Sequence, residues 1–135
     1  PFVTYNVLAP KFSPDRDGSR WVKVRAYLES AVKVKAVIAL QELDDTWKPK
    51  VSDLLVANQY STAAARRDRI LAVLLAWPHS EYEKTEKHTV SSAEMLKFFE
   101  RGNPWRLDPD GAEGARHVRR LGNVVLMVHL KPHRY

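Results

Sequence analysis

The run Ala-Val-Ile-Ala-Leu at residues 36–40, followed directly by Gln41 and Glu42, most constrains how this chain can fold. Apolar residues follow one another here without alternating with polar ones. A run of strand length with this pattern is typical of a central strand that is covered on both faces. The chain is therefore expected to pack helices against a sheet, which is an α/β architecture.

Helical and strand-like segments alternate around this run. The first segment alternates apolar and polar residues with the period of a strand until Pro10 ends it, and the next has apolar residues at helical spacing. In the second helix, Asp45 or Thr46 is expected to provide the cap. The predicted order is β-α-β-α-β and then mainly β, with strands at 2–9, 36–42, 70–77 and 119–131 and helices at 20–33 and 44–60.

The chain has 135 residues, enough for one domain at most. It begins with Pro rather than Met, and its last residues follow directly on an apolar run, so we expect residues 1–135 to be a single incomplete domain. Residues 78–119 are the least readable part, since a helix-capping pattern at Ser91 is followed by a stretch rich in turn formers. We expect this part to be an insertion of loop and helix.

The absence of cysteine excludes a disulfide framework and any thiolate zinc site. It fits a reducing, intracellular compartment, such as the cytoplasm or the mitochondrion. No apolar run approaches the roughly 18 residues that a membrane span needs, so we expect no membrane partner.

Basic residues outnumber acidic ones by 22 to 16, which gives a formal net charge of +6. Such an excess suits a phosphate-bearing partner such as RNA, but it is equally common on solvated basic surfaces. Arginines that could contact phosphates cluster in two places. The candidate nucleic-acid-binding residues are Arg66, Arg67, Arg69, Arg116, Arg119 and Arg120.

Glu42 follows the apolar strand at its carboxyl end, where ligands bind in open α/β sheets. With Asp44 and Asp45 just after it, this carboxylate suits Mg²⁺, which binds carboxylate oxygens and keeps several waters. Asn6 would lie at the same edge if the first strand runs beside this one, and its amide could orient a phosphate oxygen or a metal-bound water. The alternative is that Glu42 is a solvated strand end and that the two aspartates cap a helix.

Several segments together resemble the endonuclease/exonuclease/phosphatase superfamily. They are Tyr-Asn-Val-Leu-Ala at 5–9, the helix containing Trp21 and Arg25, Leu-Gln-Glu at 40–42, and Asn-Val-Val-Leu at 123–126. The order and spacing look closest to the deadenylase and nocturnin-like branch, and the resemblance covers residues 1–77 and 120–131. It implies half of a two-layer α/β sandwich, either active or degenerate.

The resemblance implies that Asn6 is catalytic and that Glu42 binds Mg²⁺. The later D-x-N and S-D-H motifs of the superfamily, which supply the general base and further metal contacts, are absent from this chain. Two functions therefore stay open. The first is the amino-terminal portion of a magnesium-dependent phosphodiester hydrolase acting on RNA, such as a 3′ exonuclease or deadenylase. The second is a catalytically inactive relative that serves as a scaffold or RNA-contacting subunit of a larger ribonucleoprotein assembly.

In this superfamily two similar halves pack sheet against sheet, so the inner sheet face of the half present here should be apolar. Left bare, such a face would exceed the few hundred Å² that soluble monomers usually expose. We therefore expect a protein partner, or the missing carboxyl-terminal half, to cover it. The residues expected on this face are Val37, Leu40, Ile70, Val73, Leu75, Val124, Leu126 and Val128.

Overall fold

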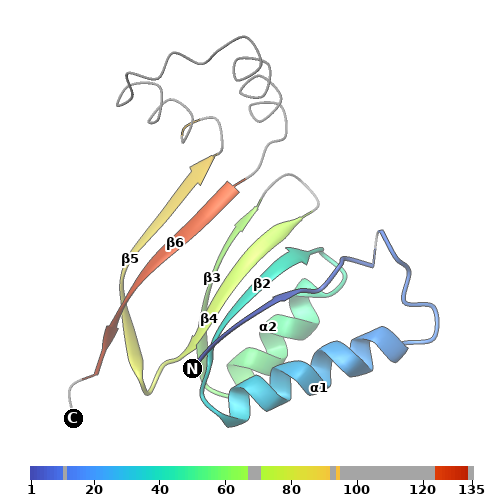
Figure 1. The fold of residues 1–135 in the computed structure, drawn as a ribbon, viewed down its shortest axis with the longest axis horizontal. Coiled ribbons are helices and arrows are strands. Elements are labelled where there is room, and N and C mark those ends of the chain that lie inside the picture. Colours follow the sequence, from blue (N-terminus) through green and yellow to red (C-terminus); the bar gives the residue numbers. More distant parts are fainter. Residues whose placement is uncertain (11, 67–70, 92–93, 95–123, 134–135) are drawn as a thin grey trace.

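The computed structural model describes residues 1–10, 12–66, 71–91, 94 and 124–133. Within these residues, strands and helices alternate at first and give way to strands, as the sequence predicts (Figure 1). The elements are β1 (Phe2–Asn6), α1 (Ser19–Lys33), β2 (Val37–Leu43), α2 (Lys48–Ala57), β3 (Tyr60–Arg66), β4 (Ala72–Pro78), β5 (Tyr82–Ser91) and β6 (Val124–Pro132).

The first layer is a sheet whose four strands are ordered β1-β2-β4-β3 within the described residues. β1 runs parallel to β2, and β4 runs antiparallel to both β2 and β3. The strands β1, β2 and β3 therefore point in the same direction, and their carboxyl ends meet at one edge of the sheet.

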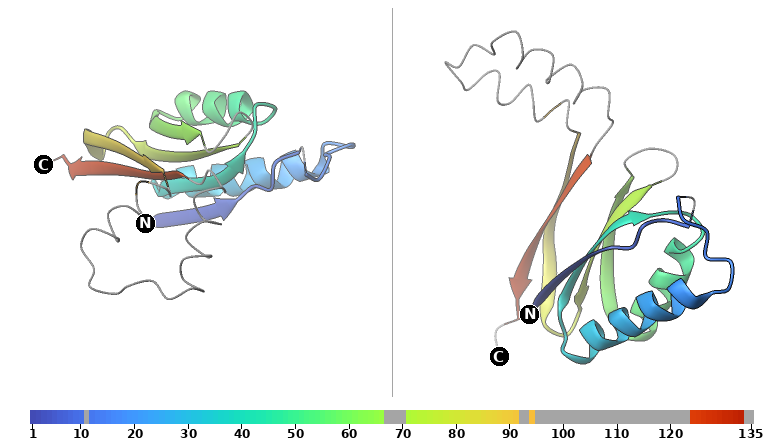
Figure 2. Two further views of the ribbon diagram at one scale, coloured as in Figure 1. Left: turned by 90° about the horizontal axis from the view of Figure 1, so that it is seen from above. Right: turned by 45° about the vertical axis from the view of Figure 1, so that its right-hand side comes forward.

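Both helices cover one face of this sheet (Figures 1 and 2). They bury an apolar core against β1, β2 and β4, which accounts for the unbroken apolar run in β2. Tyr5 of β1 stacks on Tyr27 of α1 with ring centroids 4.5 Å apart. The largest fully buried side chains are Trp47, Leu28, Ile38, Leu40, Leu43, Leu55, Leu74 and Val51.

A hairpin of β5 and β6 forms the second layer, on the side of the sheet away from the helices (Figure 2). Along β6, Val128 and Leu130 are half-buried, whereas Met127 and His129 between them are exposed. Trp77 of β4 is only 2% exposed, although it lies on the face that carries no helix. The α/β fold is as predicted. The sequence predicts that a partner or a missing half covers the open sheet face, whereas part of the cover comes from this chain's own β5-β6 hairpin.

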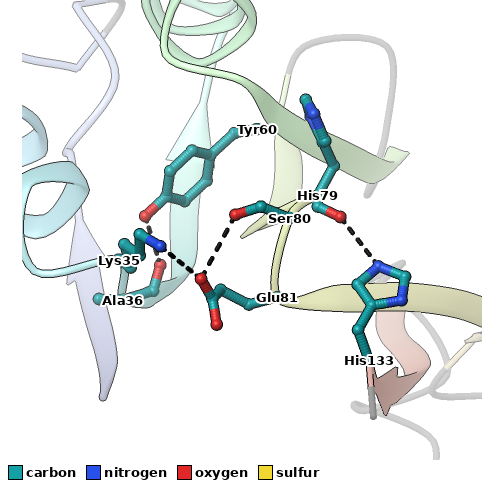
Figure 3. Close-up of polar contacts among 7 residues, drawn as sticks. All are labelled: Lys35, Ala36, Tyr60, His79, Ser80, Glu81 and His133. Atoms are coloured by element: carbon teal, nitrogen blue, oxygen red, sulfur yellow. Dashed lines mark hydrogen bonds and ion pairs between the residues drawn. The ribbon is translucent and has the colours of Figure 1, made fainter. Parts of the chain in front are cut away.

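Polar contacts attach the hairpin to the sheet at the edge opposite the carboxyl ends of β1 and β2 (Figure 3). Lys35 forms an ion pair with Glu81, and the backbone N–H of His133 donates to the carbonyl of Glu81 at 3.0 Å. The ring Nε2 of His133 donates to the carbonyl of His79 at 3.0 Å. Nearby, the hydroxyl of Tyr60 donates to the carbonyl of Ala36 at 3.0 Å, and burial raises the pKa of this tyrosine.

The second predicted helix is too long at both ends. The side chain that holds its amino end belongs to Asp44, and not to Asp45 or Thr46 as predicted. Asp44 Oδ1 accepts the backbone N–H groups of Thr46 at 3.0 Å and Trp47 at 3.1 Å. The helix ends at Ala57, and Gln59 then takes a left-handed backbone conformation, with φ of 61°. This turn redirects the chain, so Tyr60 begins strand β3 instead of ending the helix.

The expectation of a loop and helix insertion at 78–119 is wrong for its first part, because Tyr82–Ser91 forms strand β5. Its sequence is polar, and its pairing with β6 rather than an apolar pattern of its own defines it as a strand. The predicted capping pattern is present: Ser91 and Glu94 each accept the other's backbone N–H, at 3.2 Å and 2.8 Å. The rest of the predicted insertion lies outside the described residues.

Candidate active site at the carboxyl edge of the sheet

The structure brings Asn6 and Glu42 to the same edge of the sheet. Asn6 is the last residue of β1 and pairs in parallel register with Gln41 of β2, so Glu42 is the next residue beyond this pair. Parallel pairing continues one step further, because the N–H of Val7 donates to the carbonyl of Gln41 at 3.1 Å. The predicted placement of the two residues at adjacent strand ends is confirmed, while their chemical roles remain predictions.

Glu42 has an unusual backbone. Its φ is 57°, in the left-handed region, and the pairing of β2 with β4 shifts register between Leu40 and Leu43. A bulge of this kind re-aims a side chain near the end of a strand. A left-handed conformation costs roughly 1–2 kcal/mol for a residue other than glycine. Leu8, Lys35 and Gln59 share this left-handed conformation, so it distinguishes Glu42 only together with the bulge at the strand end.

Asn6 organises the turn that follows it. Its side-chain Oδ1 accepts the N–H of Leu8 at 2.9 Å, and Leu8 is itself left-handed, with φ of 46°. The neighbouring Gln41 donates from Nε2 to Thr4 Oγ1 at 2.8 Å across the strand pair. This bond gives Gln41 a structural role in the pairing of β1 with β2. This local hydrogen bond gives one structural reason for an asparagine at the end of the strand.

The two aspartates after Glu42, Asp44 and Asp45, form contacts with the protein itself. Asp44 is 4% exposed and holds the start of α2 by its side chain, as described above. Asp45 forms an ion pair with Arg66, with Oδ1 and Nη2 2.7 Å apart, and both side chains are largely exposed. The alternative considered for these two aspartates, helix capping, is therefore correct for Asp44.

Arg66 ends β3 at the same edge as Asn6 and Glu42. Its guanidinium is positioned near the candidate site through Asp45, and an exposed pair of this kind costs little to separate. The other arginines predicted to contact nucleic acid lie outside the described residues. These are Arg67, Arg69, Arg116, Arg119 and Arg120.

The side chains at this edge carry oxygen atoms, which are the type of ligand that Mg²⁺ binds. Mg²⁺ prefers oxygen ligands and is commonly bound through one or two carboxylates while it keeps several waters. Glu42 is half-buried and Asn6 is exposed, and the two residues follow neighbouring strand ends, so a carboxylate and an amide are available at one sheet edge. Among the described residues, no group of three or more His, Asp or Glu side chains could hold a metal ion. Glu42 would therefore need further oxygen ligands from water or substrate.

Sequence reasoning missed Arg20, a half-buried arginine in the first turn of α1 whose guanidinium contacts the loop after Asn6. The available signal was its place directly before Trp21, at the junction of a turn-rich loop and an amphipathic helix. A basic side chain in the first turn of a helix is electrostatically unfavourable there and needs a compensating contact.

The described elements form an α/β fold that matches part of larger solved structures. Two solved structures share it: ANGEL2, described as a 2′,3′-cyclic phosphatase, and the same protein in complex with adenosine-2′,3′-vanadate. Their TM-scores are 0.64 and 0.63, with 18% and 19% sequence identity. The match covers 96% and 97% of this chain but 36% of each ANGEL2 chain, so the chain spans about a third of their length.

No protein-family model and no curated protein sequence matches the chain. The similarity to ANGEL2 thus establishes the fold, and the deadenylase and nocturnin-like branch suggested by the sequence motifs has no support from it. Across the described parts of the chain, no helix combines the length and the apolar character needed to cross a membrane.

Proposed function

We propose that the protein containing this chain is a magnesium-dependent hydrolase of phosphate esters in RNA. The observation that carries the proposal is the placement of Asn6 and Glu42 at one sheet edge, with Glu42 in a left-handed bulge. In this proposal Glu42 holds the cation and Asn6 orients a phosphate oxygen or a metal-bound water. The bound Mg²⁺ would supply Lewis-acid stabilisation of charge on the phosphoryl oxygens.

The chemistry of the structural neighbour supports an RNA substrate. A 2′,3′-cyclic phosphate, on which ANGEL2 is described as acting, needs both ribose hydroxyls and therefore forms on RNA and not on DNA. The net charge of +6 fits a polyanionic substrate, and Arg66 stands at the candidate edge. The other predicted arginines would add phosphate contacts that are blind to sequence and sensitive to salt.

The substrate class is tested with two oligoribonucleotides of the same sequence incubated with the natural full-length protein. One ends in a 2′,3′-cyclic phosphate, and the other ends in free 2′ and 3′ hydroxyls. Opening of the cyclic phosphate alone would indicate a terminal phosphoesterase. Shortening of the hydroxyl-ended oligonucleotide would support the finer proposal of a 3′ exonuclease or deadenylase.

Glu42→Gln is the decisive variant, because it keeps the side-chain shape and removes the charge that binds the cation. We expect activity to fall at least about 100-fold, since even outer partners of metal ligands contribute about 10- to 100-fold. Asp53→Asn is the matched control: it removes an exposed carboxylate from helix α2, and activity should stay within a few-fold of wild type. Full magnesium-dependent activity in Glu42→Gln would place the metal elsewhere and contradict the proposed role.

A second candidate is a catalytically inactive scaffold or RNA-contacting subunit of a ribonucleoprotein assembly. It is favoured by the small number of possible metal ligands among the described residues. This function predicts no turnover of either oligonucleotide with Mg²⁺, together with RNA binding that weakens as salt rises. The assay above therefore separates the two functions.

A further inference from the structure

The side chain of Arg20 contacts the loop that follows Asn6. One guanidinium nitrogen, Nη1, donates to the carbonyl of Ser13, and the other, Nη2, donates to the carbonyls of Val7, at 3.1 Å, and Leu8. These carbonyls belong to the two residues directly after Asn6 and to Ser13, near the middle of the same loop. A single planar cation thus closes the loop on itself.

The same guanidinium contacts the segment that follows Glu42. Its central carbon lies 4.9 Å from the ring centroid of Trp47, the residue directly before α2. Trp47 is 1% exposed, and its backbone N–H is bound by Asp44, two residues after Glu42. A guanidinium over a buried tryptophan ring is attracted to it by the charge distribution of the ring.

The position of Arg20 is itself fixed by its neighbours. The carboxylate of Asp15 accepts the backbone N–H groups of Arg20 at 3.0 Å and of Trp21 at 2.9 Å, which ties down the first turn of α1. Trp21 in turn packs against Trp47, with ring centroids 6.0 Å apart. The guanidinium is therefore held on a rigid base when it contacts the two segments.

We infer that Arg20 is a positioning residue that fixes the segment after Asn6 relative to the segment after Glu42. A left-handed residue, Leu8, lies in the first segment, and another, Glu42, lies directly before the second, so contacts that fix both segments offset the cost of these conformations. Lysine cannot replace this function, because a point charge cannot contact several carbonyls in a plane and also stack on a ring. The effect on catalysis rests on the proposed function, whereas the effect on the two segments does not.

The test compares Arg20→Lys with Arg25→Lys in the natural full-length protein. Arg25 is the matched control, because it lies on the same helix but is 61% exposed and pairs only with the exposed Glu29 among the contacts that the structure describes. In Arg20→Lys, the amides of Leu8, Phe12 and Ser13 should exchange with deuterium at least about 10-fold faster, because charged hydrogen bonds that close the loop are lost. In Arg25→Lys, exchange should match wild type.

A second measurement addresses the site itself. Mn²⁺ takes oxygen ligands in the same geometry as Mg²⁺ and broadens nearby NMR signals. In the wild type it should broaden the signals of Asn6 and Glu42 together; in Arg20→Lys it should broaden Glu42 while the effect on Asn6 falls several-fold. With an oligoribonucleotide substrate, kcat should fall about 10-fold or more with KM changed less than about 2-fold, as expected when transition-state alignment is lost.

Three outcomes are decisive. Exchange in Arg20→Lys that matches Arg25→Lys would overturn the inference, as would altered exchange with unchanged Mn²⁺ broadening at Asn6. Absence of Mn²⁺ broadening at both residues in the wild type would contradict the proposed function instead, and the exchange rates would still decide whether Arg20 holds the loop after Asn6.

Discussion

Glu42 combines a side chain that suits metal binding with a backbone that suits glycine. Its φ of 57° lies in a region that glycine adopts freely, whereas a residue with a side chain loses roughly 1–2 kcal/mol there. A glutamate in such a position is costly for stability. This cost is understandable if the carboxylate is needed for function.

We therefore predict that Glu42→Gly stabilises the protein by about 1 kcal/mol and removes its activity, because relief of strain exceeds the entropy that glycine loses on folding. Chemical denaturation measures the first effect and the oligonucleotide assay the second. Gln59→Gly is the matched control, since Gln59 has a φ of 61° just after α2, far from the candidate site. It should give a similar gain with full activity, and a Glu42→Gly variant that is active or clearly less stable would contradict the prediction.

The sequence predicted where Asn6 and Glu42 lie, but not how their backbones are shaped. The apolar run before Gln41 identified a central strand, and the parallel neighbour followed from the intervening helix. The bulge at Glu42 depends on the register of β2 against β4, a pairing between segments far apart in the chain. A local pattern carries no information about such a pairing.

The start of helix α2 depends on a buried side chain. Asp44 is 4% exposed and accepts the N–H groups of Thr46 and Trp47, so its loss would leave buried backbone donors without this partner. We predict that Asp44→Ala lowers the free energy of unfolding by about 1–2 kcal/mol, the upper part of the range for helix caps.

Asp45→Ala is the control for this prediction. Asp45 is 65% exposed and pairs with an exposed Arg66, so its removal should cost less than about 1 kcal/mol. Urea denaturation of both variants, followed by circular dichroism, measures the difference. Equal stability of the two variants would mean that the Asp44 hydrogen bonds contribute nothing beyond an exposed ion pair.

Elements with an apolar pattern were predicted and elements without one were missed. The strands β2 and β4 bury one face under the helices and place the other toward the second layer, so their sequences are apolar except for Gln41 and Glu42 near the end of β2. By contrast, β3 is rich in alanine and β5 is polar, and each is a strand because of its partner. Pairing with a neighbour is a tertiary property that overrides local preference.

The sheet and the β5-β6 hairpin leave an apolar cleft between them. The cleft has a volume of about 560 Å³, and its lining includes Phe2, Val37, Leu75, Val128 and Leu130. The expectation of an apolar inner face is met by Val37, Leu75 and Val128, but it is wrong for Leu40, which is buried in the core against the helices. The expectation for Ile70 and for the side chain of Val124 lies outside what the structure describes.

The hairpin covers only part of the inner face, since Phe2 at the cleft remains 64% exposed. In the ANGEL2 structures this fold belongs to a chain about three times as long, as the 36% coverage indicates. We propose that a further protein segment, from the same polypeptide or from a partner, fills the cleft. Residues 1–135 expressed alone should therefore self-associate and bind a dye that reports exposed apolar surface.

Sedimentation and dye fluorescence test this proposal with two matched variants. Phe2→Ser removes an aromatic ring from the cleft and should lower dye binding about 2-fold or more, whereas Val22→Ser removes a comparably exposed apolar side chain from helix α1, outside the cleft lining, and should leave it unchanged. The contrast arises because a contiguous apolar patch binds the dye and an isolated exposed residue does not. A monomer that unfolds cooperatively and binds no dye would show that residues 1–135 close their own core, and the proposal of a covering segment would have to be abandoned.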